Sequence, residues 1–394
     1  MSYMRIGINA SFARKQNTGI GQVTANFLKK LAEFSISNSQ FSNNKNKYFI
    51  YLEEKLPKGF KLPKNFKQRV FLPKYKRDDI FRAIWWQKFL LPKKVQDDKC
   101  DVFLSMFQCA TVMPKNIKHL MIVHDIILNI FPKYLNNWRK KYFWSLSKKA
   151  IRKADKIIAV SHRTEKDLIQ HLGIDAAKIS VAYIDVDEIY KKEISEEESQ
   201  RVLKKYKLKP GYILAGGGLE VRKNIEGALK AYKILQDKYG QSGWVPPLVV
   251  YGKLMPELKP LVTDAEKVAE ELEIKKQVKF LGCVSQADLP YLYRNASVFV
   301  YPSLYEGFGM PILEAMNQGT PVVTSKVSSL PEVGSDAVLY CDPERPEDIA
   351  MVVKNILNNN HLKAALSMKG RERATHFSWE KFVGKVINIL KDIN

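Results

Sequence analysis

The chain of 394 residues carries a formal net charge of +23, and 45% of its residues are hydrophobic and 27% charged. This length exceeds one ordinary hydrophobic core and predicts two domains, while the composition excludes an intrinsically disordered chain. Residues 1–150 hold 29 Lys and Arg against 9 Asp and Glu, which is +20 of the total, so we expect an anionic partner: nucleic acid, an anionic membrane or a phosphorylated substrate.

Membrane spans and secretion signals are not indicated. The first residues, MSYMRIGINASF, lack the apolar region of a signal peptide, and no segment approaches about 18 consecutive apolar residues. We therefore expect the protein in the cytoplasm, and the basic first part leaves open a peripheral position on the inner face of the cytoplasmic membrane. The four cysteines have no CxxC spacing, which argues against a zinc site or a disulfide framework.

Short β-branched or aromatic runs alternate with helical segments, which predicts α/β units with mainly parallel sheets. The first set of expected strands is 5–10, 48–53, 101–106, 119–125, 156–161 and 178–183. A polar, acidic stretch at 185–200 is typical of a linker and a helix start. The second set is 211–217, 247–253, 278–282, 297–303, 321–325 and 337–342.

Two such sheets in tandem predict two domains, 1–188 and 189–377, with ligands bound in the cleft between them at the carboxyl ends of the strands. The remaining residues, 378–394, predict a helix that packs back on the first domain. Its buried stripe would be Phe382, Val386 and Leu390.

In the first half, the segment NTGIGQVTAN places Gly19 and Gly21 before a helix, as a loop that approaches a ligand would. It lacks the third glycine and the downstream acid of a dinucleotide fingerprint. His124 and Asp125 follow an expected strand. A single histidine there is more often structural than catalytic, yet at the mouth of a cleft it can donate to a ligand hydroxyl. Ser161 is expected to cap the next helix.

Residues 78–94 and 137–154 mix aromatic with basic side chains. One interpretation is a pair of amphipathic helices that dock on the first sheet with their charges in water. The other is an interfacial face that holds the protein on an anionic leaflet. The sequence leaves both open.

In the second half, AGGGLEVRKN follows a strand and carries Gly217, Gly218, Arg222 and Lys223 before a helix. Two adjacent cations at a strand end suit a leaving diphosphate; the alternative is a solvated basic turn. Asp185 and Asp187 form a D-x-D pair, for which we favour a linker role over a metal site.

The segment EGFGMPILEAMNQG predicts a helix from about Met310 to Gly319, because Pro311 suits its first turn and the glycine ends it. Gly307, Phe308 and Gly309 then lie at a helix N-terminus, which favours an anion such as a diphosphate. Glu306 and Glu314 frame this site and can accept hydroxyl groups. A nucleotide sugar offers hydroxyls on both sides of its diphosphate; the alternative is an ordinary capped surface turn.

EGFGMPILEAMNQGTPVV resembles the E-x7-E signature of the retaining glycosyltransferases of the GT-B fold, family 4, and the similarity extends less tightly into the first half. It implies two Rossmann-like domains that face each other across a cleft, the first for the acceptor and the second for the nucleotide sugar. By resemblance, the glycine loop at Gly19 and Gly21 covers the diphosphate and borders the acceptor, and His124 lies near the donor sugar.

The same resemblance implies that Glu306 contacts the donor sugar, the amides of Gly307 to Gly309 the sugar and phosphates, and Glu314 the ribose. Arg222 and Lys223 would bind the diphosphate in place of a metal. No protein nucleophile is then required, because the departing phosphate itself takes the acceptor proton.

The expected function is therefore metal-independent, retaining transfer of a hexose to a saccharide or a lipid-linked glycan, in the synthesis of lipopolysaccharide, O-antigen or another surface polysaccharide. The opening RIGINASFARKQNTGIG is similar to mannosyltransferases of the family, which favours GDP-mannose over UDP-sugars as donor substrate, with no other cofactor. Phe280 and Leu281 are the expected contacts to the base. Two alternatives stay open: an inactive binding subunit and a basic nucleic-acid-binding protein.

Overall fold

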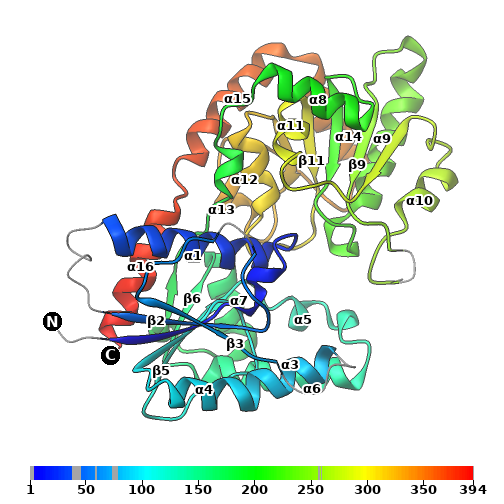
Figure 1. The fold of residues 1–394 in the computed structure, drawn as a ribbon. Helices are drawn as coiled ribbons and strands as arrows, with labels where there is room; N and C mark the ends of the chain where they lie inside the picture. The colour runs from blue at the N-terminus through cyan, green and yellow to red at the C-terminus, as the bar shows by residue number, and fades with distance from the viewer. Residues whose placement is uncertain are drawn as a thin grey trace. The chain divides into compact units, whose positions relative to one another are not determined.

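The computed structural model describes residues 4–37, 46–57, 60–72, 79–255, 258 and 260–393. The chain divides into two compact units (Figure 1). Unit 1 comprises Met1–Asp185 together with Ser378–Asn394, and unit 2 comprises Val186–Phe377. The expected boundaries lay at 188/189 and 377/378. In the described residues, no helix is long and apolar enough to cross a membrane.

The described part of unit 1 forms a seven-stranded parallel sheet in the order β3-β2-β1-β4-β5-β6-β7. Its central strands are buried on both faces, as parallel strands with helical crossovers are. Helices α1 and α16 cover one face and α4 and α6 the other (Figure 1). The strands are β1 (Arg5–Asn9), β2 (Lys47–Leu52), β3 (Phe66–Val70), β4 (Val102–Ser105), β5 (Lys118–Val123), β6 (Lys156–Ala159) and β7 (Ile179–Val181).

The helices of unit 1 connect these strands, apart from α16, which the chain adds after unit 2. They are α1 (Gly19–Ser37), α3 (Asp79–Trp85), α4 (Leu91–Asp97), α5 (Ile127–Ile130), α6 (Trp138–Lys153), α7 (His162–Leu172) and α16 (Trp379–Asp392), with short turns η1 (Ser11–Arg14), η3 (Pro132–Tyr134) and η4 (Ala176–Lys178). Ser161 caps α7 by accepting from Thr164 N at 3.0 Å, which confirms the expected cap. The expected stripe of the last helix is also confirmed.

Two features of unit 1 differ from expectation. Strand β3 was missed, because only Phe66 in it is buried and it pairs with a single neighbour at the sheet edge. The helix expected at 78–94 is interrupted by a π-helical segment, η2 (Trp86–Leu90), between α3 and α4. Pro92 lies in the first turn of α4 and has no N–H to donate, which favours such a break. Residue 78 lies outside the described residues.

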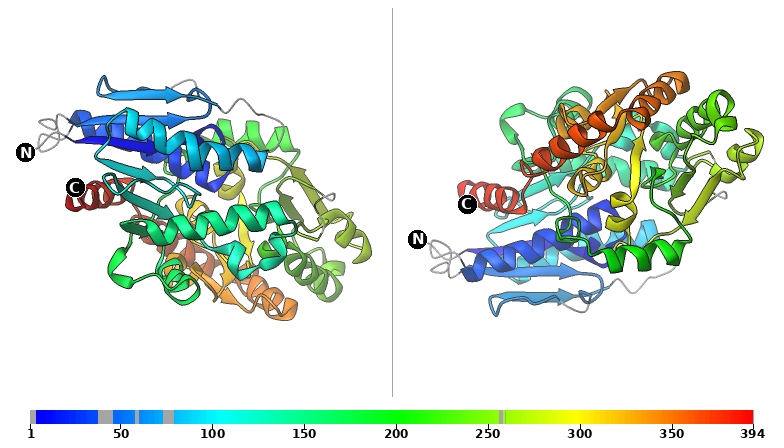
Figure 2. Two further views of the ribbon diagram at one scale, coloured as in Figure 1. Left: turned by 90° about the horizontal axis from the view of Figure 1, so that it is seen from below. Right: turned by 90° about the horizontal axis from the view of Figure 1, so that it is seen from above.

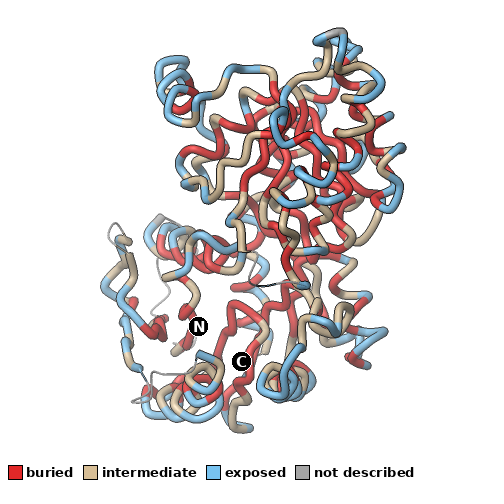
Figure 3. Tube along the Cα trace, turned by 90° about the vertical axis from the view of Figure 1, so that its right-hand side faces the viewer, coloured by how far each residue is buried: buried red, intermediate tan, exposed pale blue. Residues whose placement is uncertain are grey.

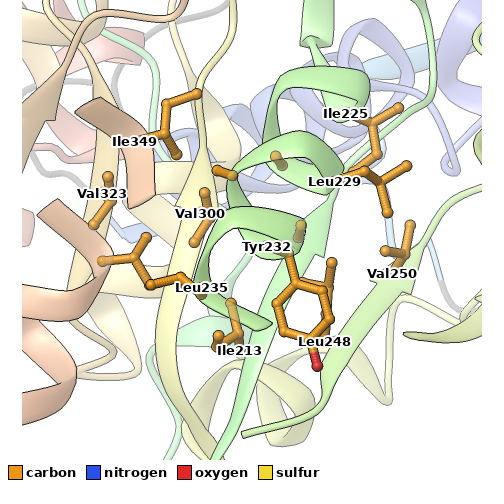
Figure 4. Packing of buried hydrophobic residues seen from close by; sticks show 14 of the residues in the cluster. Ile213, Ile225, Leu229, Tyr232, Leu235, Leu248, Val250, Val300, Val323 and Ile349 are labelled. Atoms are coloured by element: carbon orange, nitrogen blue, oxygen red, sulfur yellow. The ribbon is translucent and has the colours of Figure 1, made fainter. Parts of the chain in front are cut away.

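The described part of unit 2 holds a six-stranded parallel sheet in the order β10-β9-β8-β11-β12-β13. Figure 3 shows the buried segments of the chain in red, and Figure 4 shows the side chains of β8, β9 and β11 packed against α9. The strands are β8 (Tyr212–Gly216), β9 (Leu248–Tyr251), β10 (Val278–Gly282), β11 (Ala296–Tyr301), β12 (Val322–Ser325) and β13 (Leu339–Cys341).

Helices separate these strands along the chain, as Figure 2 shows from two further sides. They are α8 (Glu196–Tyr206), α9 (Ile225–Tyr239), α10 (Ala265–Glu271), α11 (Leu289–Arg294), α12 (Met310–Asn317), α13 (Leu330–Gly334), α14 (Pro346–Asn358) and α15 (Asn360–Ala374), with short turns η5 (Glu188–Tyr190), η6 (Val221–Lys223) and η7 (Gly240–Ser242).

The stretch 185–200, expected to be a linker and a helix start, begins where unit 1 ends and unit 2 starts, and its first part is packed rather than solvated. Asp185 and Tyr190 are fully buried, and the Tyr190 carbonyl accepts from Gln318 Nε2 at 2.6 Å. Asp187 caps η5 by accepting from Ile189 N at 3.1 Å. The expected helix start is confirmed, since Ser195 caps α8.

The order of the strands in unit 2 reverses between β8 and β11, which are neighbours. In open parallel sheets, the loops that follow two such strands diverge and leave a binding crevice at their carboxyl ends. These two loops, 217–224 and 302–309, contain Arg222, Lys223 and Glu306.

Candidate active site

Glycines bring the loop after β8 close to its neighbours. Gly216, Gly217 and Gly218 all have positive φ angles, of 143°, 95° and 119°. A Cβ atom on Gly216 would lie 2.1 Å from the Tyr251 carbonyl oxygen, and one on Gly217 would lie 3.3 Å from Pro311 at the start of α12. A side chain at either position would therefore push the loop away from β9 or α12.

The centre of the site is one carboxylate between two cations. Lys223 Nζ lies 2.6 Å from Glu306 Oε1, and Arg222 Nη1 lies 2.9 Å from Glu306 Oε2. The side chains of Lys223 and Glu306 are each 8% exposed and that of Arg222 16%. The structure thus brings together Arg222, Lys223 and Glu306, which were all expected at the site.

These charges fix the ionisation of Glu306. Burial by itself would raise the pKa of its carboxyl, but Arg222 and Lys223 outweigh that effect and lower the pKa to about 2. Glu306 is therefore charged at every pH at which the protein is expected to work. With Arg222 and Lys223 both protonated, the net charge of the three side chains is +1, while burial and the neighbouring Arg222 lower the pKa of Lys223.

Two hydroxyl groups complete the surroundings of Glu306, and sequence reasoning missed both. Tyr301 OH donates to Glu306 Oε1 at 2.7 Å, and Ser303 Oγ lies 2.9 Å from the same oxygen. Lys223 Nζ also donates to Tyr301 OH. Their position at the end of β11, three to five residues before Glu306, was the available signal.

Asn224 holds the two loops in register. Its backbone is left-handed, with φ of 56°, and its Oδ1 caps α9 by accepting from Gly227 N at 3.1 Å. Its Nδ2 donates to the carbonyls of Pro302 and Pro343 at 3.1 and 2.7 Å. One side chain thus links the loops that follow β8, β11 and β13.

Helix α12 begins at Met310, as expected, directly after the site. Gly309 is its N-cap residue with φ of 111°, and Gly319 follows its end with φ of 72°. Gly307 and Phe308 are buried, and Ser329 Oγ lies 2.8 Å from the Phe308 carbonyl. The positive end of α12 is therefore anchored beside Glu306.

Glu314, inside α12, lies in a group of tyrosines. Tyr293 OH donates to Glu314 Oε2 at 3.0 Å and lies 2.6 Å from Tyr251 OH. Burial raises the pKa of Glu314 to about 7, although hydrogen bonds from Tyr293 and Tyr190 oppose the rise. These tyrosines come from separate parts of the chain, so no local pattern could have indicated them.

The two residues expected at the base lie on the edge strand of the sheet. Phe280 is partly buried and packs against the core of unit 2, and Leu281 is half-buried at a register shift in β10.

The remaining expected site residues belong to unit 1. Gly19 and Gly21 were expected in a loop before a helix, and this was wrong, because Gly19 starts α1 and Gly21 lies in its first turn. A Cβ atom on Gly21 would be 1.9 Å from the Lys15 carbonyl oxygen. This close approach within the chain is itself a reason for glycine at position 21.

His124 follows β5 and is buried, with its Nε2 2.9 Å from the Met106 carbonyl oxygen. Burial lowers the pKa of His124. Since a carbonyl only accepts, Nε2 carries the proton, and the neutral ring offers a ligand an acceptor at Nδ1 rather than a donor. Arg163, in the next helix, pairs with the buried Asp167 at 3.0 Å.

Across the ranges that the structure describes, no group of three or more His, Cys, Asp or Glu side chains is arranged to hold a metal ion. The positive charge at the site comes from Arg222 and Lys223.

Two family models match the chain: glycosyl transferases group 1 over residues 195–373, and glycosyltransferase family 4 over residues 49–188. The chain is 36% identical over 269 residues to the O-antigen chain mannosyltransferase B of Escherichia coli, covering 68% of each chain. It is 31% identical over 253 residues to the O-antigen chain mannosyltransferase RfbU of Salmonella typhimurium, covering 63% of this chain and 64% of that one.

Among solved structures, the chain is similar to Anabaena Alr3699/HepE in complex with UDP and glucose, with a TM-score of 0.72, 16% sequence identity, and coverage of 99% of this chain and 100% of that one. This similarity confirms the fold class expected from the sequence, two Rossmann-like α/β domains of the GT-B type.

Proposed function

This chain belongs to glycosyltransferase family 4, and on that premise we propose that it transfers mannose from a nucleotide diphosphate sugar to a saccharide or a lipid-linked glycan. The observation that carries the proposal is the pair of cations, Arg222 and Lys223, held by Glu306 beside the start of α12. The two mannosyltransferase relatives, both named for O-antigen chains, support the sugar and a role in surface polysaccharide synthesis.

Arg222 and Lys223 would stabilise the departing nucleoside diphosphate. When the bond between the anomeric carbon and the phosphate oxygen breaks, negative charge grows on that oxygen. Fixed cations in a water-poor site stabilise this charge without reorganising, and losing one such group typically lowers the rate by about 100- to 1,000-fold. The same two charges can do the work of a divalent cation, so we propose metal-independent transfer.

We propose that configuration at the anomeric carbon is retained. The acceptor oxygen would bond to that carbon on the face from which the diphosphate leaves, and its proton would pass to the departing phosphate oxygen. Glu306, which Arg222 and Lys223 hold as an anion, would contact the donor sugar, while Glu314 would accept a hydrogen bond from the ribose. The Nδ1 atom of His124 would accept a hydrogen bond from a hydroxyl group of the donor sugar.

We propose GDP-mannose as the donor, on the basis of the mannosyltransferase relatives. A thermal-shift panel with GDP, UDP, ADP and their sugar conjugates tests this, because a ligand at about 100 times its Kd adds about 2.7 kcal/mol to native stability. We expect the largest shift with GDP and GDP-mannose. A larger shift with UDP would overturn the choice of base, and no shift with any nucleotide would overturn the proposed function.

Lys223→Ala tests the role of the cations. We expect kcat for transfer from the selected donor to fall about 100- to 1,000-fold, with the fold intact by circular dichroism. The matched control is Lys230→Ala on α9, where Lys230 pairs with Glu226 on the surface at 2.7 Å. Near-normal turnover of the Lys223 variant would refute the assignment. Activity that survives EDTA would support metal-independent transfer. An α-linked product, detected by NMR after reaction with an α-linked donor, would support retention of configuration.

A further inference from the structure

A row of exposed aromatic side chains crosses three segments of unit 1. We define the aromatic row as Phe81, Trp85, Phe89, Trp138 and Tyr142, which are 39%, 55%, 49%, 63% and 44% exposed. The rings of Trp85 and Phe89 are 5.2 Å apart, and those of Phe81 and Trp138 are 5.9 Å apart. Phe81 precedes Trp85, and Trp138 precedes Tyr142, by four residues on one helix face, so the row is continuous from η2 through α3 to α6.

This row is not the face by which these helices pack on the sheet. Helix α6 buries Trp144, Ala150 and Ile151, which lie on its opposite side. Helix α3 buries Ile84, and η2 buries Trp86. The side chains that α3, η2 and α6 bury in the core are therefore different from those of the aromatic row. Contiguous large apolar groups left at a surface mark an interaction site more often than scattered ones do.

The row lies within a positively charged surface. Helix α6 contains seven Lys and Arg and no Asp or Glu, and Lys141 and Lys149 are exposed on the same side as Trp138 and Tyr142. Arg139 lies 5.8 Å from the centre of the Phe81 ring, and Lys88 Nζ lies 5.1 Å from that of Phe89.

We propose that the aromatic row and the cations beside it dock unit 1 on the surface of an anionic lipid bilayer. Tryptophan and tyrosine rings are favoured at the level of the headgroups, and each basic residue near an anionic surface adds about 1 kcal/mol, or about fivefold in partitioning. The choice of a bilayer rests on the proposed function, since a lipid-linked acceptor would be met there.

Two observations favour a bilayer over a nucleic acid as the occupant. Stacking of bases needs open ring faces, but Arg139 lies over Phe81 and Lys88 over Phe89. Trp138 packs against Phe81 at 62° and Trp85 packs against Phe89 at 49°, so neither pair is parallel. Ring edges and apolar corners, which the row does present, suit insertion between headgroups.

Co-sedimentation of the full chain with vesicles tests the proposal. We expect binding to phosphatidylcholine vesicles with about 30% phosphatidylglycerol, weaker binding in high salt, and little binding to pure phosphatidylcholine. Trp85→Ser with Trp138→Ser should lower partitioning at least about tenfold, and Lys141→Ser with Lys149→Ser about 25-fold. The matched control is Met351→Ser with Met368→Ser, which removes two side chains of unit 2 that are 61% and 71% exposed.

Several outcomes would overturn the proposal: no binding of the wild type to anionic vesicles, or binding by the tryptophan variant that equals the wild type. Self-association without lipid that the tryptophan variant abolishes would assign the row to a second copy of the chain. Displacement from vesicles by tRNA that requires the two tryptophans would assign it to nucleic acid.

The closing measurement separates this proposal from the proposed function. Nucleotide-induced thermal shifts need no membrane, so they should be unchanged in the tryptophan variant. Vesicle binding with no nucleotide binding would refute the proposed function and leave the docking face in place, and the opposite result would refute the docking face alone.

Discussion

Glu306 is the ion-pair partner of both Arg222 and Lys223, the two cations that we propose for the donor diphosphate. The Glu306 carboxylate and the donor diphosphate would therefore compete for the same positive charges. A donor would bind only by taking over at least part of these interactions. Glu306 therefore has two opposing effects on donor binding. It keeps the two cations in position, and it lowers their affinity for an anion.

We predict that Glu306→Gln binds the nucleoside diphosphate more tightly than the wild type while it transfers sugar more slowly. A neutral amide removes the competing charge, and hydrogen bonds to charged groups contribute about 1.5–3 kcal/mol each, so we expect the Kd to fall about tenfold. Isothermal titration calorimetry measures it. An unchanged or larger Kd would contradict the competition, and Glu226→Gln on the surface of α9 is the control.

The two signature glutamates should affect stability at different pH. Burial raises the pKa of Glu314 from its ordinary 4.5 to about 7. Between these values the native state binds a proton that the unfolded chain has released, so stability falls as pH rises through this window, by up to about 3 kcal/mol. The pKa of Glu306 is lowered from 4.5 to about 2, so its contribution is complete above pH 4.5 and is lost as the pH falls toward 2.

Calorimetry of the wild type and Glu314→Gln at pH 5 to 8 tests this prediction. The unfolding midpoint of unit 2 should fall between pH 5 and 8 by roughly 6–12 °C more in the wild type than in the variant. Parallel profiles would mean that Glu314 does not titrate in this window.

At this scale, the sequence predicted Arg222, Lys223, Glu306 and Glu314 because each stands in a short segment whose strand or helix could be recognised. Tyr293 and Tyr251 could not be predicted, since they reach Glu314 only through the fold of the sheet. The ring orientation of His124 also depends on a distant group, the Met106 carbonyl.

Among the elements of unit 2, the turn before α9 depends on one side chain, that of Asn224. We predict that Asn224→Ala lowers stability by about 2–3 kcal/mol, because it loses the cap and forces alanine into a left-handed backbone. Asn224→Gly should cost about 1 kcal/mol less, since glycine adopts positive φ without strain. Thermal unfolding measures both, and equal losses would show that the backbone angle is not the source.

The elements that the sequence missed share a cause. Strand β3 and the π-helical η2 both depend on neighbours rather than on their own periodicity: β3 on pairing with β2, and η2 on Pro92 and on Trp86, whose Nε1 donates to the Phe71 carbonyl at 3.0 Å. The strands that were found are buried apolar runs, for which periodicity and composition suffice.

In the molecule as a whole, unit 1 is built from two separate parts of the chain. Helix α16 packs on α1, where Phe382 and Phe27 have ring centres 6.1 Å apart and Lys30 pairs with Glu380 at 2.6 Å. The side chains that it buries are Trp379, Phe382, Val383, Val386, Ile387 and Leu390.

We predict that a chain ending at Phe377 has an unfolded unit 1 and a folded unit 2. Each large apolar side chain contributes about 1.5–3 kcal/mol when it is fully buried, so six of them rival the whole stability of a typical domain. Limited proteolysis with mass spectrometry should cleave within residues 1–185 and spare residues 186–377. The variant Phe382→Ala serves for comparison, because it should lower the free energy of unfolding by only about 3–5 kcal/mol. Equal resistance of the truncated and full chains would contradict the prediction.

The division of unit 1 also sets an order of events at the ribosome. Residues 378–393 are synthesised after all of unit 2, so the first 185 residues wait for the helix that covers α1. At about 5–20 residues per second, the delay is roughly 10–40 s. During that time the face of α1 that α16 later covers is exposed to solvent. Unit 2 can fold before unit 1, although unit 1 is synthesised first. We therefore expect chaperones to bind the nascent chain during this interval.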